Sequence, residues 1–322
     1  MRSWKCYQDG ARESLRLVSG SIPIPRPKQI LLHVAATTVE SADARIRALR
    51  LPREFGAVCR LAFGWRRPPQ PVLGSIVAGT IAAVGSGVRG WVEGDCIVAA
   101  AGPRFGAHAE WLLLGPGQSV VRRPATVTVE HALSVAFGGI AALYFLERAR
   151  AATGERILVI GATGSVGGAL VQLARAQGLE VEGMSSGANL QLASELGAHL
   201  LHDYRLRPLH TLTPAGYDIV ADTASASSFV ECLPLLAERG RFLGIASELP
   251  AMLAHPVCGR SAVYGAAPDS VEYLQKAVDL AEAGVLRPTI DSVFGFEDLP
   301  LAHARVDSGQ KRGCVLVSCL RS

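Results

Sequence analysis

The sequence lacks several features that mark whole classes of protein. Its 322 residues contain no uninterrupted apolar run of about 18 residues, and the N-terminal stretch MRSWKCYQDGARES has no apolar signal core. The seven cysteines are scattered, with no CxxC pair and no histidine at metal-ligand spacing. We therefore expect a soluble, cytoplasmic protein with reduced thiols and no membrane partner.

Concentrated positive charge is missing as well. The formal net charge is only +4, and the lysines and arginines form neither a long run nor a repeated basic face. A stripe of basic and aromatic residues, which would bind single-stranded nucleic acid, is not found either. We expect no nucleic acid partner.

Apolar residues and glycine are abundant. Hydrophobic residues make up 49% of the chain and charged residues 19%, and there are 34 glycines, which is the composition of a well-packed globular protein. The length exceeds the size at which a single hydrophobic core keeps growing. We expect two domains.

The chain shows two different patterns of expected secondary structure. Residues 30–115 carry short apolar strands bounded by Gly, Pro or Asp, which predicts a small β-rich barrel. After Pro124, buried strands alternate with amphipathic helices, which predicts parallel βαβ units and a doubly wound α/β sheet. A final strand, helix and strand return to the barrel. We predict one domain from residues 1–123 with 267–322, and a second from residues 124–266.

A glycine loop lies at the start of the second domain. The stretch ILVIGATGSVGG, from Ile157 to Gly168, is an apolar strand that breaks into glycines where a helix begins. Backbone N–H groups at a helix N-terminus, with glycine allowing close approach, suit a pyrophosphate. A tight turn without a ligand has the same pattern, but the run of βαβ units that follows favours a dinucleotide site.

The end of the next strand indicates which dinucleotide is bound. A free ribose 2′-hydroxyl usually pairs with a carboxylate about 20 residues beyond the loop. The sequence there is EVEGMSSGAN, which offers Ser185, Ser186 and Asn189 rather than an acid, and so favours NADPH over NADH. Tyr204 and Arg205 could add to a 2′-phosphate site, although a plain surface turn explains them equally well.

Taken together, these motifs resemble the medium-chain dehydrogenase/reductase superfamily, and within it the zinc-independent quinone oxidoreductase-like and enoyl reductase-like branch. The resemblance covers nearly the whole chain and implies a GroES-like catalytic domain with an inserted Rossmann domain. It also implies a homodimer formed through the edge strand GRSAVYGAA. The motifs that carry it are VESADARIR, PVLGSIVAGTIAAVGSGVRGWVEGD, GAHAEW, ILVIGATGSVGGALVQLARAQG, SELGAHLLHDY and SGQKRGCVLV.

The resemblance assigns cofactor contacts by position. The 2′-phosphate side would be formed by Ser185, Ser186, Asn189 and Tyr204. The residues implied for the pyrophosphate are Gly161, Gly164, Ser165, Val166 and Gly167, and those for the nicotinamide edge are Ile245 and Ala246.

The chain departs from the zinc-dependent members of the superfamily. Those members carry a Cys where Glu40 stands, a His where Ser75 stands and a further ligand near Phe137, and they have a four-cysteine lobe that is absent here. One carboxylate cannot make a zinc site, so we expect no metal. Metal-free members often keep an acid where Ile76 stands, whereas this chain has its acid at Glu40. The resemblance therefore implies that the carboxylate lies at a different position here.

Three side chains are candidates for the chemistry. Arg45 lies where the resemblance implies a residue near the nicotinamide ribose, and its guanidinium could bind ribose or polarise the substrate; a surface ion pair with Asp43 or Glu40 is the alternative. Glu40 could deliver a proton, or could belong to a structural ion pair. His108 is more readily explained as a packed barrel residue than as an acid.

We therefore expect a metal-free, NADPH-dependent oxidoreductase that transfers hydride to an activated alkene, such as an enone or enoyl group, or to a quinone. The segment ASELPAMLAHPVCGRS is short for a lid, which favours a bulky small-molecule substrate. Two alternatives stay open: an NADP-dependent carbonyl or alcohol dehydrogenase, and a cofactor-binding isomerase or cyclase without net redox turnover.

Overall fold

The computed structural model describes residues 1–7, 14–48, 70–212, 216–245 and 256–320. The chain divides into two compact units. We call residues 1–136, 269–282 and 288–322 the barrel unit, and residues 137–268 and 283–287 the parallel-sheet unit. The first boundary thus falls inside a helix, 13 residues after the predicted position (136 against 123), because α3 (Val129–Ala149) contributes to both units.

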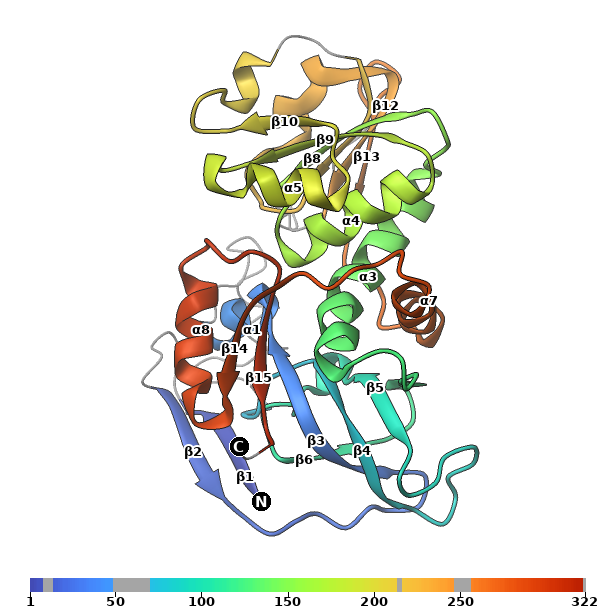
Figure 1. Ribbon diagram of the computed structural model, residues 1–322, viewed down its shortest axis with the longest axis vertical. Helices are drawn as coiled ribbons and strands as arrows, with labels where there is room; N and C mark the ends of the chain where they lie inside the picture. Colours follow the sequence, from blue (N-terminus) through green and yellow to red (C-terminus); the bar gives the residue numbers. More distant parts are fainter. Residues whose placement is uncertain (8–13, 49–69, 213–215, 246–255, 321–322) are drawn as a thin grey trace. The chain divides into compact units, whose positions relative to one another are not determined.

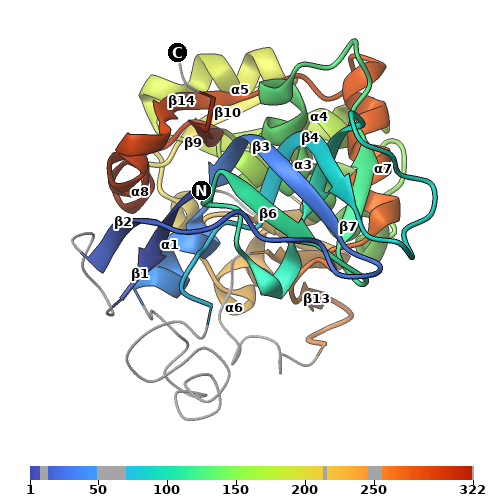
Figure 2. The same ribbon diagram turned by 90° about the horizontal axis from the view of Figure 1, so that it is seen from below.

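The barrel unit is built around one apolar core from strands that pair antiparallel, except for β14 and β15, which are parallel to each other. Seven strands form one sheet, in which the order is β14-β15-β3-β4-β5-β7 and β6 pairs with β3 (Figures 1 and 2). Strands β14 and β15 come from the C-terminal end of the chain, and β15 pairs with β3, which confirms that the C-terminus returns to the barrel. The strands of this unit are β1 (Arg2–Cys6), β2 (Leu15–Ser19), β3 (Ile30–Val39), β4 (Ile76–Val84), β5 (Cys96–Ala100), β6 (Trp111–Leu114), β7 (Ser119–Arg122), β14 (Ile290–Gly295) and β15 (Cys314–Ser318).

Three helices cover this sheet. Helix α8 packs on β14, β15 and β3 and contacts α1, whereas α7 packs on β7. The core between the sheet and α8 contains Leu32, Val77, Val315 and Leu299, each almost fully buried. The helices are α1 (Ser41–Arg47), α7 (Val271–Glu282) and α8 (Leu299–Asp307), with short 3₁₀ turns at η3 (Gly102–Arg104) and η8 (Phe296–Asp298).

The parallel-sheet unit is a doubly wound sheet. Its six strands are all parallel and follow the order β10-β9-β8-β11-β12-β13, which is the Rossmann order, with β13 at one edge. The predicted α/β fold, a GroES-like barrel with an inserted Rossmann sheet, is confirmed. The strands are β8 (Arg156–Ile160), β9 (Glu180–Ser185), β10 (Leu200–Asp203), β11 (Tyr217–Asp222), β12 (Leu236–Gly244) and β13 (Ser261–Tyr264).

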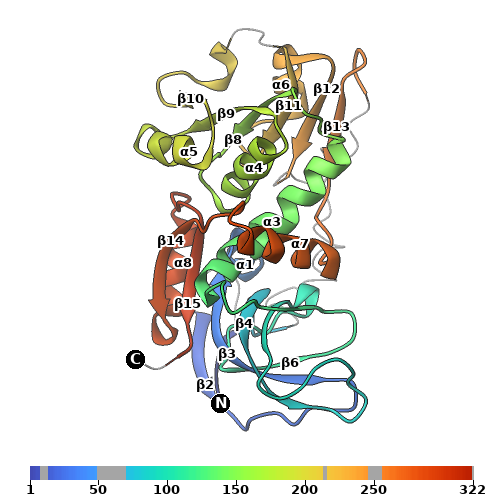
Figure 3. The ribbon, with the colours of Figure 1, turned by 45° about the vertical axis from the view of Figure 1, so that its right-hand side comes forward.

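Helices lie on both faces of this sheet. A Cβ at Gly183 would contact Ala193 and Ala198 on the α5 side, whereas the next residue, Met184, packs with Phe229 of α6. Successive strand residues point to opposite faces, so α5 and α6 lie on opposite faces, and Figure 3 shows α4 beside α5. The helices are α4 (Ser165–Ala176), α5 (Leu190–Leu196) and α6 (Phe229–Cys232), with 3₁₀ turns at η4 (Gly187–Asn189), η5 (Leu209–Thr211) and η6 (Leu233–Leu235).

Among the described residues, α3 alone has the length and composition of a membrane span. However, 72% of its most apolar window is buried inside the structure. The core helix of a globular domain meets the same criterion, so α3 carries no argument for a membrane.

Candidate cofactor site and polar cluster

The connection from β8 to α4 is a tight glycine loop. Gly161 has a φ of +81°, which favours glycine, and its N–H donates to the carbonyl of Met184 on β9 at 3.0 Å. The carbonyl of Gly161 then accepts from the N–H of Gly164 at 3.1 Å. The chain therefore turns sharply as it leaves the sheet and enters α4.

Two glycines of this loop have different structural roles. A Cβ on Gly167 would lie 2.0 Å from the carbonyl oxygen of Gly161, so glycine is needed there for α4 to pack against the loop. Among the described residues, a Cβ on Gly164, the N-cap of α4, would meet no atom closer than 3.6 Å, so these residues leave space beside Gly164. The sequence singled out both positions without distinguishing these roles.

The start of α4 fits a pyrophosphate. The first helical hydrogen bond runs from the N–H of Gly168 to the carbonyl of Gly164 at 2.8 Å, so the N–H groups of Ser165, Val166 and Gly167 face beyond the helix start. The positive end of the helix dipole lies at the same place. A phosphate group needs both such amides and space, and the described residues leave space beside Gly164.

The loop lies where the direction of the sheet order reverses. Strands β9 and β11 flank β8, and ligands of doubly wound folds bind outside the carboxyl ends of the strands at such a point. After β11, the hydroxyl of Thr223 donates to the carbonyl of Ile160 at 2.8 Å. After β12, the N–H of Ile245 donates to the carbonyl of Asp222 at 3.0 Å. Ile245 therefore lies at the carboxyl end of β12, next to the end of β11, whereas Ala246 is outside the described residues.

The residues predicted for the 2′-phosphate lie at the ends of β9 and β10. Ser185 is buried, and its hydroxyl oxygen is 2.9 Å from that of Thr163 in the glycine loop. Ser186 is the N-cap of η4, and its carbonyl accepts from the N–H of Asn189 at 2.8 Å. Tyr204 is exposed, and its N–H donates to the carbonyl of Ser185 at 3.2 Å. The structure brings these four residues to one corner of the sheet.

The barrel unit holds a buried polar cluster around Glu40. Glu40 follows β3 and is the N-cap of α1, with only 1% of its side chain exposed. Its Oε2 is 3.2 Å from the Nζ of Lys311, which is itself only 10% exposed, and its Oε1 accepts from the thiol of Cys314 at 3.2 Å. Burial raises the pKa of the Cys314 thiol well above its usual value, so the thiol keeps its proton and donates it. Both oxygens of Glu40 are thus hydrogen-bond acceptors.

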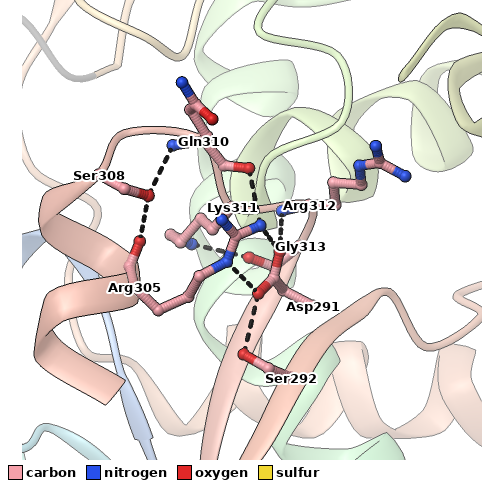
Figure 4. Close-up of polar contacts among 8 residues, drawn as sticks. All are labelled: Asp291, Ser292, Arg305, Ser308, Gln310, Lys311, Arg312 and Gly313. Carbon is pink, nitrogen blue, oxygen red and sulfur yellow. Dashed lines mark hydrogen bonds and ion pairs between the residues drawn. The ribbon is translucent and has the colours of Figure 1, made fainter. Parts of the chain in front are cut away.

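The loop that carries Lys311 is tightly held (Figure 4). Arg305 of α8 donates to both carboxylate oxygens of Asp291 on β14, at 2.7 and 2.6 Å, and the N–H of Arg312 donates to the same carboxylate at 2.7 Å. Lys311 also donates to the carbonyl of Gly313 at 2.8 Å. Although burial raises the pKa of Asp291, the hydrogen bonds from Arg305 and Arg312 outweigh it and lower that pKa. Arg305 also donates to the carbonyl of Gln310 at 3.0 Å, so this network holds the backbone on either side of Lys311.

Asp43 is a second buried carboxyl in this cluster. Its Oδ2 accepts from the N–H of Glu40 at 2.8 Å and its Oδ1 from the N–H of Gly74 at 3.1 Å. Burial, together with the nearby charge of Glu40, raises the pKa of Asp43 to about 7, although the two backbone hydrogen bonds lower it. Asp43 is therefore a buried group and not a surface residue, and its pKa lies close to neutral pH.

The two arginines of α1 lie in different surroundings. Arg45 is exposed, on the opposite side of the helix from buried Asp43 and Arg47. Arg47 is buried and pairs with both carboxylate oxygens of Asp307 on α8, at 2.9 and 2.7 Å. Of the two arginines Arg45 and Arg47, only Arg45 is exposed to solvent.

His108 is fully buried in the barrel unit. Its Nε2 is 3.0 Å from the carbonyl oxygen of Thr38, and burial lowers its pKa to about 4, so the ring is neutral near pH 7. The ring of His303 on α8 packs edge to face against it, with the centroids 5.5 Å apart. These contacts match the interpretation of His108 as a packed barrel residue.

Comparison with known proteins assigns the family. The model of the alcohol dehydrogenase GroES-like domain matches residues 26–152, and that of the zinc-binding dehydrogenase domain matches residues 196–317. A chloroplast envelope quinone oxidoreductase homolog from Arabidopsis thaliana is 27% identical, over 96% of this chain and 95% of its own. The chain belongs to the medium-chain dehydrogenase/reductase superfamily.

Other members of this superfamily show the same extent of similarity. A 2-methylene-furan-3-one reductase from Solanum lycopersicum is 27% identical over 98% of this chain and 79% of its own. The solved structure of a quinone oxidoreductase from Coxiella burnetii superposes with a TM-score of 0.88 over 99% of both chains, at 23% identity. The chain lies in the quinone oxidoreductase-like branch and is an oxidoreductase that uses a nicotinamide cofactor.

The positions that bind zinc in other superfamily members do not fit a metal here. Among the described residues, no group of three or more His, Cys, Asp or Glu side chains is arranged to hold a metal ion. Glu40 lies at one of the positions that bind zinc in those members, and its carboxylate accepts hydrogen bonds from the ammonium of Lys311 and the thiol of Cys314. An ammonium that already pairs with a carboxylate opposes the approach of a dication to it.

Sequence reasoning missed two carboxyl groups of this superfamily member. The sequence suggests Asp43 only as a surface partner of Arg45, although its position three residues after Glu40 is that of a capping box. Asp203, directly before Tyr204, carries no local signal of a site. It pairs in register with Ser185, and only the alignment of β10 with β9 reveals that.

Proposed function

We propose that this protein is a metal-free, NADPH-dependent oxidoreductase that transfers hydride to the β-carbon of an activated alkene or to a quinone. The observation that carries the proposal is the glycine loop at the switch point of the sheet, where the described part of the chain leaves space beside Gly164. The bound nicotinamide would supply the hydride. The amides of Ser165, Val166 and Gly167 would hold the pyrophosphate.

The β9 tip supports the choice of NADPH. The strand ends in Ser185, with Ser186 and Asn189 after it, and offers no carboxylate at the position that usually binds a ribose 2′-hydroxyl. The guanidinium of Arg205 is exposed beside Tyr204, 5.9 Å from the centre of its ring. A cation and hydroxyl groups suit a 2′-phosphate.

The relatives support the choice of acceptor. One is named a quinone oxidoreductase homolog and another a 2-methylene-furan-3-one reductase. Without a metal, the negative charge that develops on the acceptor oxygen needs hydrogen-bond donors. Arg45 is the donor that we propose, because its side chain is exposed and always charged.

The proton that completes the reduction has two candidate sources, Glu40 and solvent ordered by Arg45. Glu40 is almost fully buried, and both of its oxygens accept hydrogen bonds from Lys311 and Cys314. Solvent at Arg45 is therefore the route we favour, with Glu40 acting to hold the start of α1. An unchanged pH profile of turnover in Glu40→Gln would agree with this assignment.

An acceptor screen tests the proposed function. NADPH oxidation is measured with quinones, enones and enoyl thioesters, and each enone is compared with its saturated ketone. We expect turnover with at least one quinone or enone, no turnover with the saturated ketone, and substoichiometric zinc by elemental analysis. Preference for the ketone would establish a carbonyl reductase instead, and NADPH binding without consumption across the panel would exclude a redox enzyme of this type.

A further inference from the structure

The cofactor corner contains a carboxylate that comes from a neighbouring strand. Strand β10 runs parallel to β9, and the last residue of each pairs with the other, Asp203 with Ser185. Adjacent strands are about 4.8 Å apart. The side chain of Asp203 is therefore displaced by one strand from the position where a ribose-binding acid usually lies.

The carboxylate of Asp203 lies against the turn that follows β9. A Cβ placed on Gly187 would be 2.5 Å from its Oδ2, so the carboxylate occupies the space beside the glycine. Gly187 is exposed and directly follows Ser186, one of the residues expected to contact the ribose. The carboxylate thus lies at the surface of the turn, within the predicted 2′-phosphate corner.

One oxygen of this carboxylate is available to a ligand. Oδ1 accepts from the N–H of Arg205 at 2.9 Å, which fixes the orientation of the side chain. Within residues 1–7, 14–48, 70–212, 216–245 and 256–320, Oδ2 receives no hydrogen bond. A half-buried carboxylate with one oxygen oriented and the other unbonded can accept a hydrogen bond from a sugar hydroxyl.

We propose that Asp203 is a specificity-determining residue of the cofactor site, which weakens binding of the 2′-phosphate of NADPH and accepts a hydrogen bond from the free 2′-hydroxyl of NADH. This inference rests on the proposed function, because it concerns the same nucleotide. Asp203 and Arg205 act on the 2′-phosphate with opposite signs. The difference in affinity between NADPH and NADH is thereby reduced, so that the protein binds both NADPH and NADH.

Calorimetry on the full chain tests this proposal without relying on turnover. Dissociation constants are measured for NADPH and NADH, and for the fragments adenosine 2′,5′-bisphosphate and AMP, with the wild type and Asp203→Asn. The amide can still accept from the N–H of Arg205, so the substitution removes charge with little change of shape. We expect the ratio of NADH to NADPH dissociation constants to rise about tenfold, and the fragment ratio to follow it.

Two further variants sharpen the result. Arg205→Gln should change the same ratio in the opposite direction. Asp218→Asn is the matched control, because Asp218 also accepts from a backbone N–H, that of Arg156 at 2.9 Å, but lies at the amino end of β11. It should leave the ratio unchanged. High salt should reduce the effect at Asp203, since it is electrostatic.

The outcomes separate this inference from the proposed function. An unchanged ratio in Asp203→Asn, or equal weakening of both nucleotides, would overturn the role of Asp203 while leaving cofactor binding intact. Failure of the wild type to bind either nucleotide would overturn the proposed function and this inference together. Should circular dichroism show that Asp203→Asn is unfolded, Asp203→Ser, whose hydroxyl can accept from the N–H of Arg205, undergoes the same measurements.

Discussion

The glycine loop and the Glu40 cluster are two polar regions built in opposite ways. The loop is made of backbone from consecutive residues, and its chemistry comes from amides and open space at the start of α4. The cluster is made of side chains, and Glu40 and Lys311 are 271 positions apart in the chain. A backbone site tolerates changes of side chain but not of shape, whereas a side-chain cluster depends on balanced charge.

The strongest test of the backbone site is Gly167→Ala. The added Cβ would lie 2.0 Å from the carbonyl oxygen of Gly161, which is backbone and cannot move without shifting β8 or α4. We expect a loss of about 4 kcal/mol or more in the free energy of unfolding, with loss of cofactor binding. Urea denaturation would measure the loss of stability, and an unchanged m-value would show that the unfolding transition itself is the same.

Gly164→Ala is the matched control for this substitution. Its Cβ would meet no atom of the described segments closer than 3.6 Å, and its φ of −77° suits alanine. Stability should change by less than about 0.5 kcal/mol, whereas affinity for NADPH should fall at least about tenfold, because the methyl group fills the space proposed for the pyrophosphate. Equal affinity of Gly164→Ala and wild type for NADPH would show that the pyrophosphate does not bind beside Gly164.

The charge balance of the side-chain cluster is tested by Lys311→Met. The substitution removes an ammonium 3.2 Å from a carboxylate that is 1% exposed. Breaking such a pair by removing one partner costs about 3 kcal/mol of stability, since the other charge stays buried. Adding Glu40→Gln to Lys311→Met should restore part of that loss. A double variant as unstable as the sum of both single variants would show that the two residues do not interact.

The sequence predicted those parts of the molecule that depend on local pattern. Alternating strands and helices after Pro124 indicated the parallel sheet, and glycines at the end of an apolar strand indicated the loop at Gly161. Both features are set by residues that are neighbours in the chain. The return of the C-terminus to the barrel was also predicted, from the strand, helix and strand expected at the end of the chain.

The sequence did not predict contacts that depend on strand register or on distant segments. Asp203 is 18 positions beyond Ser185 in the numbering (203 against 185), and only the pairing of β10 with β9 brings them together. Cys314 and Glu40 meet because β15 pairs with β3. A single sequence carries no signal for either contact, because no local rule relates residues of different strands.

The pH dependence of stability distinguishes the buried cluster from the loop, which contains no titrating side chain. The pKa of Asp43 is about 7 in the folded state, against 3.8 as the ordinary value, because the carboxyl is buried. Between these values the folded protein binds more protons than the unfolded chain, so this group stabilises the fold at low pH and that contribution is lost as pH rises towards 7.

Asp43→Asn removes this dependence. The stability of the wild type minus that of the variant should fall by about 2 kcal/mol from about pH 4.5 to about pH 6. The difference is the useful quantity, because burial lowers the pKa of His108 to about 4 and its contribution has the opposite slope over this range in both proteins. A difference that is flat with pH would show that Asp43 is ionised throughout.

The smallest effect is expected at Arg45, the exposed member of α1, where the side chain is proposed to act on substrate and not on the fold. Arg45→Ala should lower kcat for the best acceptor about tenfold, less than for a buried donor because solvent and salt screen an exposed charge. Stability and the dissociation constant for NADPH should not change. Arg45→Lys should recover part of the rate, and Arg89→Ala, which removes another exposed arginine of the barrel unit, should have no effect. If Arg45→Ala left kcat unchanged while Glu40→Gln lowered it, the chemistry would have to be assigned to the buried side chains of the cluster. Buried Glu40, and not exposed Arg45, would then be the residue that acts on the substrate.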